Sequence, residues 1–368
     1  MAKAARTRFR ERLLVIGMGS AGQVVAATEA RARRRYVVAA VVDDLPVSAT
    51  RPIPCPLLGP IARLAEIVDE VRPDRIVVGL GERRRRTPLR VLVESCVARG
   101  IVVEDAVEFC ERLTGKLPIE TIPPASLVFS RRFGPSRNQQ AVARVVSLAV
   151  ASLGLAVLWP LLALIALAVK LESAGPVLFV QERIGAGGRP FSLLKFRTMR
   201  VGRPKSEWEC DNRDRVTRVG RWLRMFRLDE LPQFVNVLRG EMNLVGPRPH
   251  PATNFELFTL VARNLNELTG SAIGYYTLRT MVRPGITGWA QVRYQYANNL
   301  DEEIEKLKYD LYYVKYASTW LDLRIVAETF RILCLGHVKQ PATGEVTQGP
   351  GVIPPISLSA SVNSTHAA

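Results

Sequence analysis

An adjacent carboxylate pair, Asp229 and Glu230, is the feature of this sequence best suited to chemistry. Pro232 follows it, and proline fits the first turn of a helix because its missing N–H group is not needed there. We therefore predict a short helix over about residues 231–238, ended by Gly240. The carboxylates then lie at the helix N-terminus, where free N–H groups and the helix dipole stabilise an ionised side chain and attract phosphate.

Arginines surround the pair in the sequence, namely Arg224, Arg227, Arg239 and Arg248. A carboxylate is a competent nucleophile toward phosphorus, and the guanidinium fork matches phosphate oxygens. Attack on a diphosphate requires such a nucleophile together with charge neutralisation and positioning. The alternative is a plain helix cap with arginines on a solvated face, and residues 229–232 alone do not separate the two.

A wider stretch around the pair, residues 224–249, resembles the core of a known enzyme family. The family is the bacterial sugar transferases that load a phosphosugar onto a polyprenol phosphate, also called monotopic phosphoglycosyl transferases. Further segments resemble it in the same order, namely Lys195-Phe196-Arg197-Thr198-Met199, Val245-Gly246-Pro247-Arg248-Pro249 and Arg283-Pro284-Gly285-Ile286-Thr287-Gly288-Trp289-Ala290-Gln291-Val292. The resemblance covers about residues 139–336, and the long members used in exopolysaccharide and O-antigen assembly look most similar.

The resemblance implies a sugar-phosphate transferase that starts glycan assembly in two steps. Asp229 is expected to attack the β-phosphorus of a UDP-sugar and release UMP. Undecaprenyl phosphate, a polyprenol phosphate, then displaces the aspartate and leaves with the phosphosugar. Glu230 is expected to bind Mg²⁺, and Lys195 to lie against the pair and hold it ionised. The expected phosphate-binding residues are Arg224, Arg248, Arg197 and Arg283.

One segment departs from the family pattern. Many small members follow Trp-Ala-Gln-Val with Asn-Gly-Arg-Asn, whereas this chain continues with Arg-Tyr-Gln-Tyr at residues 293–296. Nucleotide contacts made by that family segment are therefore not carried over to this chain. The sequence also does not identify the sugar, because no recognisable segment contacts the sugar ring.

The N-terminal part begins with a pattern typical of dinucleotide-binding domains. A strand at residues 13–16 precedes a G-x-G-x-x-G run, an Ala-rich helix extends to about residue 35, and a strand at residues 36–42 ends at an acidic residue. The candidate nucleotide-binding residues are Gly17, Gly19, Gly22 and Asp43. The same pattern also serves close packing of a helix on a strand. We favour a regulatory or dimerising domain over one that binds NAD or another dinucleotide.

Further β–α units follow, with predicted helices over residues 61–71 and 89–99 and predicted strands over residues 75–80 and 101–103. Alternating strands and helices predict a doubly wound parallel sheet, so residues 1–114 are expected to form a Rossmann-like domain of the α/β class. Residues 115–140 are rich in proline and are predicted to be a linker. In long members of the family, several transmembrane helices usually precede such a domain, whereas the sheet is the first predicted element here.

The uncharged run at residues 145–169 is long enough to cross a bilayer as a helix. Trp159 and Pro160 fall in its middle, where the proline is expected to kink or break the helix. Basic residues flank the run on both sides, which fits two cytoplasmic ends. We favour a re-entrant helix over residues 141–171 that enters one leaflet, turns at Trp159-Pro160 and returns. A spanning helix stays the alternative.

Residues 172–339 are predicted to form a small α+β catalytic domain. We expect a β-hairpin over residues 177–183 and 190–197, a basic amphipathic helix over residues 216–226, and helices over residues 300–316 and 321–335. The amphipathic helix suits an anionic membrane surface and a domain core equally well. Residues 340–368, rich in Ser, Pro, Gly and Thr, are predicted to be disordered.

Composition limits the partners and the compartment. The net charge of +17 indicates a polyanionic partner such as anionic membrane lipid or a phosphorylated substrate, and the lack of a nucleic-acid motif argues against nucleic acid. The cysteines are widely spaced, which argues for reduced thiols, a cytosolic compartment and no zinc site. We therefore expect a protein at the cytoplasmic face of the bacterial inner membrane. A homodimer is left open, and the rival functions are a membrane-attached dinucleotide oxidoreductase and a non-enzymatic membrane scaffold.

Overall fold

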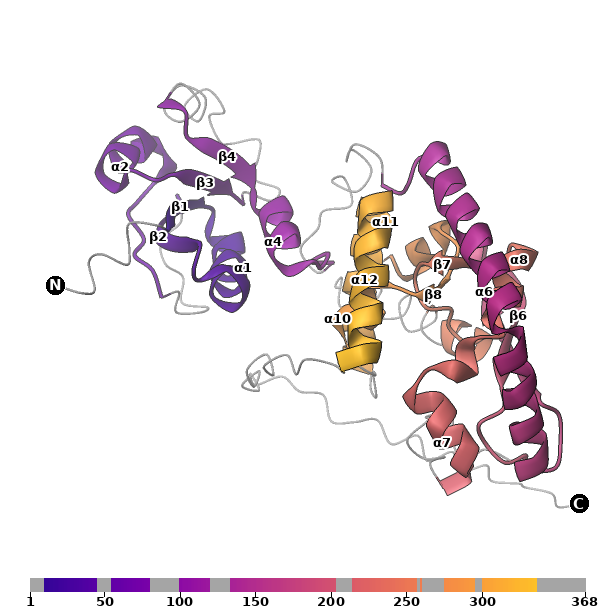
Figure 1. Cartoon of the computed structure of the whole chain (residues 1–368). Coiled ribbons are helices and arrows are strands. Elements are labelled where there is room, and N and C mark those ends of the chain that lie inside the picture. Colours follow the sequence, from indigo (N-terminus) through magenta and orange to yellow (C-terminus); the bar gives the residue numbers. More distant parts are fainter. Residues whose placement is uncertain are drawn as a thin grey trace, which may run out of the picture. The chain divides into compact units, whose positions relative to one another are not determined.

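Four parallel strands form a sheet in the N-terminal part of the protein (Figure 1). The computed structural model describes residues 10–44, 54–79, 99–119, 133–202, 214–256, 259, 275–294 and 300–335. The strands are β1 (Glu11–Ile16), β2 (Tyr36–Val42), β3 (Arg75–Val78) and β4 (Val102–Asp105), in the order β2-β1-β3-β4. The predicted parallel α/β sheet is confirmed. The predicted tail 340–368 and, apart from Arg99, the predicted helix 89–99 lie outside the described residues.

The central strand β1 is apolar because both faces of the sheet are covered. Leu13 and Val15 pack with helices α1 (Met18–Ala27) and α4 (Ala106–Thr114) on one face. Leu14 and Ile16 pack with α2 (Leu64–Val71) on the other face. A parallel strand buried on both sides needs such a continuous apolar run, which is why the sequence predicted this strand.

Helix α4 is an element that the sequence-based prediction did not include. It begins after Asp105, whose Oδ1 atom accepts hydrogen bonds from the N–H groups of Val107 (2.8 Å) and Glu108 (3.4 Å). It ends at Gly115, which has a φ angle of 68°. An Asp cap, an acidic residue in the first turn and a glycine at the end are start and stop signals that the sequence does carry.

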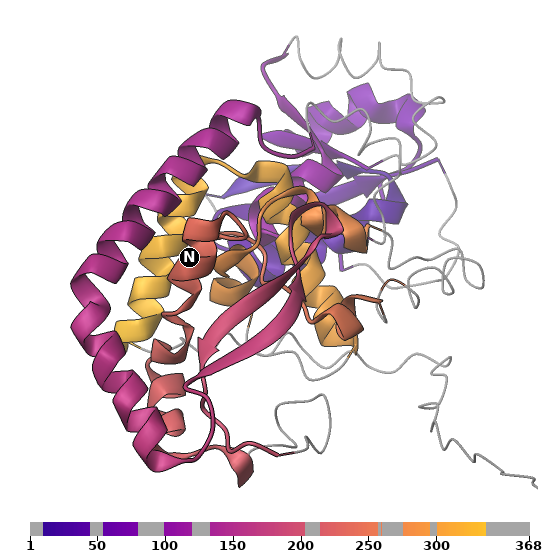
Figure 2. The same ribbon diagram turned by 90° about the vertical axis from the view of Figure 1, so that its right-hand side faces the viewer.

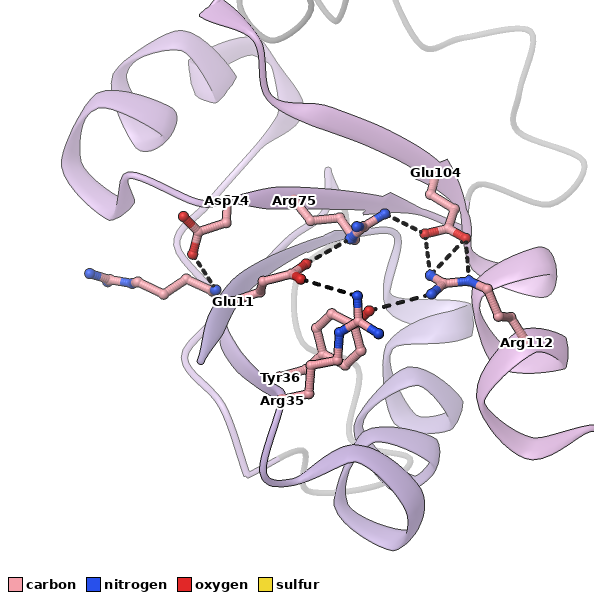
Figure 3. Close-up of polar contacts among 8 residues, drawn as sticks. Glu11, Arg35, Tyr36, Asp74, Arg75, Glu104 and Arg112 are labelled. Atoms are coloured by element: carbon pink, nitrogen blue, oxygen red, sulfur yellow. Dashed lines mark hydrogen bonds and ion pairs between the residues drawn. The ribbon is translucent and has the colours of Figure 1, made fainter. Parts of the chain in front are cut away.

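A network of ion pairs ties the sheet and α4 together where β1, β2 and β3 begin (Figure 3). Arg75 donates hydrogen bonds to Glu11 (3.2 Å) and Glu104 (2.8 Å). Arg112 donates to Glu104 (2.7 Å) and to the hydroxyl of Tyr36 (3.4 Å). The network therefore links the edge strand β4 and its following helix to the centre of the sheet.

The C-terminal part combines a hairpin, two short parallel strands and several helices (Figure 1). Its elements are β5 (Leu178–Ile184), β6 (Pro190–Phe196), α7 (Arg218–Met225), α8 (Gln233–Arg239), β7 (Asn243–Val245), a 3₁₀ segment (Tyr276–Met281), β8 (Gly285–Thr287), α10 (Trp289–Arg293), α11 (Leu300–Tyr316) and α12 (Thr319–Leu335). Strands β5 and β6 pair antiparallel, as predicted, and β7 pairs parallel with β8. The amphipathic helix and the two C-terminal helices are confirmed with small shifts of their ends.

Helix α6 (Arg137–Glu172) is, among the described residues, the one helix with the length and composition to cross a membrane. It begins with a capping box between Ser136 and Gln139, so the helix starts before the predicted residue 141. Pro160 lies inside it, and Figure 2 shows that the helix bends part-way along its length. The break into a hairpin expected at Trp159-Pro160 is not seen. One proline removes one backbone hydrogen bond, and the apolar turns on both sides stay helical.

Both halves of α6 pack against the C-terminal part. In the first half, Ala151 joins a buried cluster with Val237 and Met242. In the second half, Ile165 and Val169 join a different buried cluster, which contains Phe196 and Leu223. The helix is therefore attached to this part along its length and not only at one end.

The chain around the end of α4 packs on the C-terminal helices. Glu111 is fully buried and lies 2.7 Å from Lys315 Nζ of α11. The indole N–H of Trp289 donates to the carbonyl of Gly115 at 2.8 Å. The N–H of Leu117 donates to the carbonyl of Lys308 at 3.0 Å. The residues before α6 thus contribute to the packing of α10 and α11.

Leu117→Ala is expected to lower the free energy of unfolding by about 2–5 kcal/mol, because a buried leucine leaves a cavity when it is truncated. Leu117 is 0% exposed and packs with Leu307 and Leu311 of α11. Thermal unfolding of the purified protein in detergent, followed by circular dichroism, measures the loss. Val102→Ala is the control, because Val102 is 47% exposed. Equal losses in the two variants would contradict the packing role of this segment.

Candidate active site

Strand β6 directs Lys195 toward the interior of the C-terminal part. Phe191 and Leu193 of this strand are buried, and Lys195 shares their face because side chains alternate along a strand. Gly187 and Gly188, with φ angles of 65° and 75°, form the turn that leads from β5 into β6. The alternation explains why a lysine side chain is only 16% exposed here.

The carboxylate pair lies in a 3₁₀ turn, Leu228–Glu230, that precedes α8. The helix predicted over residues 231–238 begins later, at Gln233, so the pair is not on its N-terminus. The turn separates the environments of the two carboxylates. Glu230 is 7% exposed, whereas Asp229 is only half-buried.

Three cations surround the carboxylate of Glu230. Its Oε1 atom lies 3.5 Å from Lys195 Nζ, 3.2 Å from Arg248 Nη2 and 3.9 Å from Arg227 Nη1. Lys195 comes from β6, Arg227 directly precedes the turn, and Arg248 lies in the loop after β7. Three segments that are distant in the sequence therefore meet at one oxygen atom.

The environment shifts the pKa values of the two carboxylates in opposite directions. Burial acts to raise the pKa of Glu230, but Arg248 and Lys195 outweigh it and lower this pKa to about 2. Burial and the neighbouring charge of Glu230 raise the pKa of Asp229. Burial and Arg248 lower the pKa of Lys195 to about 8. Glu230 is thus a fixed anion, and Asp229 is the more basic and more accessible carboxylate. Such a separation is typical of paired groups with different chemical roles.

Arg224 lies on the side of Asp229. Its Nε atom donates to the hydroxyl of Thr198 at 2.8 Å, which ties the last turn of α7 to the segment after β6. Its charge acts to lower the pKa of Asp229, against the effect of burial. The predicted group of Asp229, Glu230, Lys195, Arg224 and Arg248 is therefore brought together.

Arg197 does not join this group. Its guanidinium donates to the carbonyls of Ser173 and Ala174, both at 2.7 Å, at the end of α6. These two residues directly follow the helix, and Arg197 also donates to the carbonyl of Val169 in its last turn at 3.4 Å, one of the carbonyls that a helix C-terminus leaves without partners inside the helix. The structure thus gives Arg197 contacts at the end of α6, away from the carboxylate pair, and its predicted binding of phosphate stays a prediction.

Arg283 also contacts a helix end. Its Nε atom donates to the carbonyl of Gly240, the residue that ends α8, at 3.1 Å. The structure thus gives this side chain a capping contact, and its predicted binding of phosphate stays a prediction.

Glycines allow the loop that carries Arg248 to approach β8. A Cβ atom at Gly246 would lie 2.4 Å from the carbonyl oxygen of Arg283, and one at Gly285 would lie 2.1 Å from the nitrogen of Gly246. Neither space admits a side chain. This close approach is the physical reason for glycine in the segments Val245–Pro249 and Arg283–Val292.

Two residues of the site were missed by the sequence analysis. Asn236 of α8 is fully buried and bonds the backbone of β6 on both sides of Leu193, at Leu194 N (3.0 Å) and Ser192 O (2.7 Å). Arg183 of β5 donates to the carbonyl of Pro249 at 2.8 Å. A charged residue paired across the hairpin with the buried Phe191 was the available signal for Arg183.

The predicted nucleotide-binding residues of the N-terminal part lie together at the start of α1. Gly17 precedes the helix with a φ angle of 103°, which requires glycine. The carboxylate of Asp43 accepts a hydrogen bond from the N–H group of Met18 at 2.5 Å. A negative charge therefore occupies the helix N-terminus, where a pyrophosphate would bind. No steric contact requires glycine at Gly19 or Gly22. Close packing therefore does not explain glycine at these two positions, and binding of a dinucleotide stays a prediction.

Comparison with known proteins identifies the family. The sequence profile of the bacterial sugar transferase family matches residues 138–336. The chain belongs to the bacterial sugar transferases. The match contains the hairpin, the carboxylate turn, the Arg248 loop and α6, so the site described above lies entirely inside the sugar transferase region.

Relatives of this sugar transferase are named for transfer to undecaprenyl phosphate. The UDP-N-acetylgalactosamine-undecaprenyl-phosphate N-acetylgalactosaminephosphotransferase of Aeromonas hydrophila is 36% identical over 268 residues, which cover 72% of this chain and 60% of that protein. The undecaprenyl-phosphate glucose phosphotransferase of Komagataeibacter xylinus is 41% identical, over 58% of this chain and 40% of that protein. The UDP-glucose:undecaprenyl-phosphate glucose-1-phosphate transferase of Caulobacter vibrioides is 42% identical, over 58% of this chain and 80% of that protein. The chain thus spans about half the length of the first two.

Glu230→Gln is expected to destabilise this sugar transferase by about 1–3 kcal/mol at pH 7, because it removes the buried counter-charge of three partly exposed cations. The loss should shrink at low pH. The folded-state pKa of Glu230, about 2, is below its ordinary value of 4.5, so the carboxylate stabilises the fold above pH 4.5. That contribution is lost as the pH falls toward 2.

Thermal unfolding of both proteins between pH 7 and pH 3.5 measures this dependence. Glu66→Gln is the control, because its side chain is 68% exposed and pairs only with the exposed Arg63 on the surface. A stability difference for Glu230→Gln that stays constant down to pH 3.5 would contradict the charge assignment.

Proposed function

We propose that this protein transfers a phosphosugar from a UDP-sugar to undecaprenyl phosphate through a covalent intermediate on Asp229. The observation that carries the proposal is the difference between the two carboxylates: Glu230 is buried and ionised by Lys195 and Arg248, and Asp229 is more open and more basic. The printed names of relatives, which include UDP-sugars and undecaprenyl phosphate, support the same reaction class.

In the first step, a carboxylate oxygen of Asp229 attacks the β-phosphorus of the UDP-sugar. The bond from this phosphorus to the bridging oxygen breaks, and UMP leaves with that oxygen and the electron pair. In the second step, an oxygen of undecaprenyl phosphate attacks the same phosphorus and the aspartate leaves. Each step replaces one P–O bond by another, so Asp229 is regenerated without a further reactant.

Cationic side chains would hold the phosphates during both steps. Arg224 is close enough for its charge to act on Asp229. Both terminal nitrogens of Arg248 donate to Glu230. A guanidinium fork binds two phosphate oxygens at once and remains charged at every relevant pH. Lys195 Nζ lies 3.5 Å from Glu230 Oε1. The pKa of Lys195 is about 8, so its amine is protonated at neutral pH.

Mg²⁺ fits this site together with a diphosphate and not as a resident ion. Within the described part of the chain, no three His, Cys, Asp or Glu side chains cluster. Protein sites that share Mg²⁺ with phosphates use only one or two carboxylates. Within the described residues, the ion-pair contacts of Glu230 fall on Oε1. We propose that Glu230 holds the ion, which when bound neutralises charge on the diphosphate.

Attachment to the membrane is proposed to be re-entrant, at the cytoplasmic face of the bacterial inner membrane. Near the start of α6, Arg144 donates to the carbonyl of Val237 at 2.7 Å. At its end, Glu172 accepts from the N–H groups of Arg218 and Val219 at 2.6 and 3.0 Å. Both ends of the helix are thus bonded to the same folded part. A straight helix that crosses the bilayer would separate them by about 30 Å of hydrocarbon.

Exposed apolar side chains support the same placement. On α6 they are Leu153, Val157, Trp159, Leu164 and Leu167. On α7, Val219 and Leu223 pack inward, whereas Trp222, Met225 and Phe226 are exposed. The amphipathic helix therefore contributes to the core and also presents an apolar edge beside arginines, which suits an anionic lipid surface.

Asp229→Asn is expected to lower the rate of UMP release by about a thousandfold or more, with the fold preserved. Asparagine keeps the size of the side chain and removes the attacking charge. The assay supplies a panel that includes UDP-glucose and UDP-N-acetylgalactosamine, with undecaprenyl phosphate and Mg²⁺. Mass spectrometry of wild-type protein given donor alone should find a phosphosugar adduct on Asp229.

Two comparisons sharpen that test. Asp69→Asn, in which the wild-type side chain is 67% exposed, should keep full activity. Glu230→Gln should lower activity and shift its Mg²⁺ dependence, since it loses a ligand and not the nucleophile. An adduct on another residue, or full activity in Asp229→Asn, would refute the assignment. No UMP release from any donor would refute the proposed function.

Pro160→Leu is expected to straighten α6 and lower activity, because leucine restores the backbone N–H that proline lacks. In the wild-type protein, single cysteines at Arg137 and Arg189 should react with an impermeant thiol reagent from the same, cytoplasmic side of sealed vesicles. The cysteine-free protein is the control. Reaction from opposite sides would exclude the re-entrant arrangement and favour a spanning helix.

A further inference from the structure

The loop that carries Arg248 is held in an unusual way. Pro247, Pro249 and Pro251 alternate with the other residues of the loop and have no N–H group to donate. The loop therefore cannot pair as a regular strand through these positions. Its placement depends on what its carbonyl groups accept.

Four successive carbonyls of this loop each accept a hydrogen bond from a different donor. Pro247 accepts from the N–H of Gly285 at 3.0 Å, and His250 accepts from the N–H of Ile184 at 3.0 Å. Between them, the carbonyls of Arg248 and Pro249 accept from arginine side chains, namely Arg279 Nη2 at 2.9 Å and Arg183 Nη1 at 2.8 Å.

Arg279 differs from Arg183 because it has a buried counter-ion. Its Nη2 atom lies 2.6 Å from Asp310 Oδ2, and the two side chains are only 5% and 3% exposed. The same guanidinium contacts the ring of His250 at 2.8 Å. Burial and Arg279 keep the pKa of His250 well below its ordinary value, so the ring is neutral and accepts a hydrogen bond.

In the described part of the chain, the ion pair of Arg279 and Asp310 contacts the backbone of Arg248 and not its side chain. Arg279 bonds the backbone of Arg248, whose side chain then reaches Glu230 with both terminal nitrogens at 3.2 Å. One nitrogen, Nη2, donates both to Asp310 and to the carbonyl of Arg248, so a planar guanidinium that is fixed by the carboxylate also fixes this carbonyl. The fixed backbone in turn limits where the Arg248 side chain can point.

We propose that Arg279 and Asp310 are positioning residues of the transferase, which hold the carbonyl of Arg248 so that its guanidinium is aimed at Glu230 and at the donor diphosphate. This inference rests on the proposed function, because it assumes that Arg248 binds phosphate. It adds that helix α11, which carries Asp310, sets the affinity for the donor without touching it.

The test uses variants that remove the pair without leaving a buried charge. Arg279→Met together with Asp310→Leu replaces the ion pair by apolar side chains, an exchange that is often neutral for stability. Asp310→Asn is the milder second variant, in which an acceptor for Arg279 remains. Lys315→Met together with Glu111→Leu is the matched control, because it removes another buried ion pair of α11 that does not contact the Arg248 loop.

The measurements are KM for the UDP-sugar and kcat of UMP release, with the melting temperature as a check of folding. The Arg279→Met/Asp310→Leu variant should raise KM on the order of 10- to 100-fold, as a displaced positioning group does. The control should leave KM unchanged. In an Arg248→Ala background, removal of the pair should have no further effect on KM, because the residue through which it acts is gone.

Other results would overturn the inference. A fall in kcat that follows the folded fraction, with KM unchanged, would show a purely structural pair. The same fold-change in the Arg248→Ala background as in the wild type would show that the pair does not act through Arg248. If the inference alone fails, the wild-type protein still releases UMP, whereas a wild-type protein that releases no UMP would refute the proposed function on which the inference rests. Wild-type UMP release therefore distinguishes the two failures.

Discussion

The arrangement of the site depends on keeping the buried carboxylate of Glu230 charged. A buried carboxylate without partners would take up a proton, since its transfer out of water costs several kcal/mol. Here Lys195, Arg227 and Arg248 lie close enough to hold the charge. Strand β6, the 3₁₀ turn and the Arg248 loop must therefore fold together. Together with burial, the charge held on Glu230 also raises the pKa of its neighbour Asp229, so one constraint acts on both the fold of the site and the basicity of the second carboxylate.

Several arginines of this protein donate hydrogen bonds to carbonyls at helix ends. Arg144 and Arg283 bond carbonyls at the end of α8, and Arg197 bonds carbonyls at the end of α6. A positive side chain at a helix C-terminus satisfies carbonyls and opposes the helix dipole. Part of the large positive charge of the chain is therefore internal structure, and only the remainder is available for lipid and substrate.

In the N-terminal part, a carboxylate bonds a helix N-terminus, as arginines bond helix C-termini elsewhere in the protein. Asp43 lies at the start of α1 and satisfies an N–H group of that helix. In dinucleotide-binding domains with this sequence pattern, the pyrophosphate lies at this helix N-terminus. The helix that follows the sheet, α4, bonds α11 through Glu111 and Lys315. The described contacts of this part are thus with its own helices and with the helices of the transferase.

The sequence by itself determined the features that depend on neighbours along the chain. Apolar runs predicted the buried parallel strands, the glycines predicted the β5–β6 hairpin, and ordered motifs predicted five side chains that the structure brings together, namely Asp229, Glu230, Lys195, Arg224 and Arg248. Tertiary structure decided the features that depend on distant residues. Glu230 is the buried carboxylate because Lys195 and Arg248 lie against it. Arg197 points toward the end of α6 because the carbonyl of Ser173 lies there. Helix α6 continues through Pro160 because the packing of both halves compensates for one lost hydrogen bond. Periodicity and motif spacing contain no information on these contacts, since they join residues on different elements that are 18 or more positions apart in the sequence.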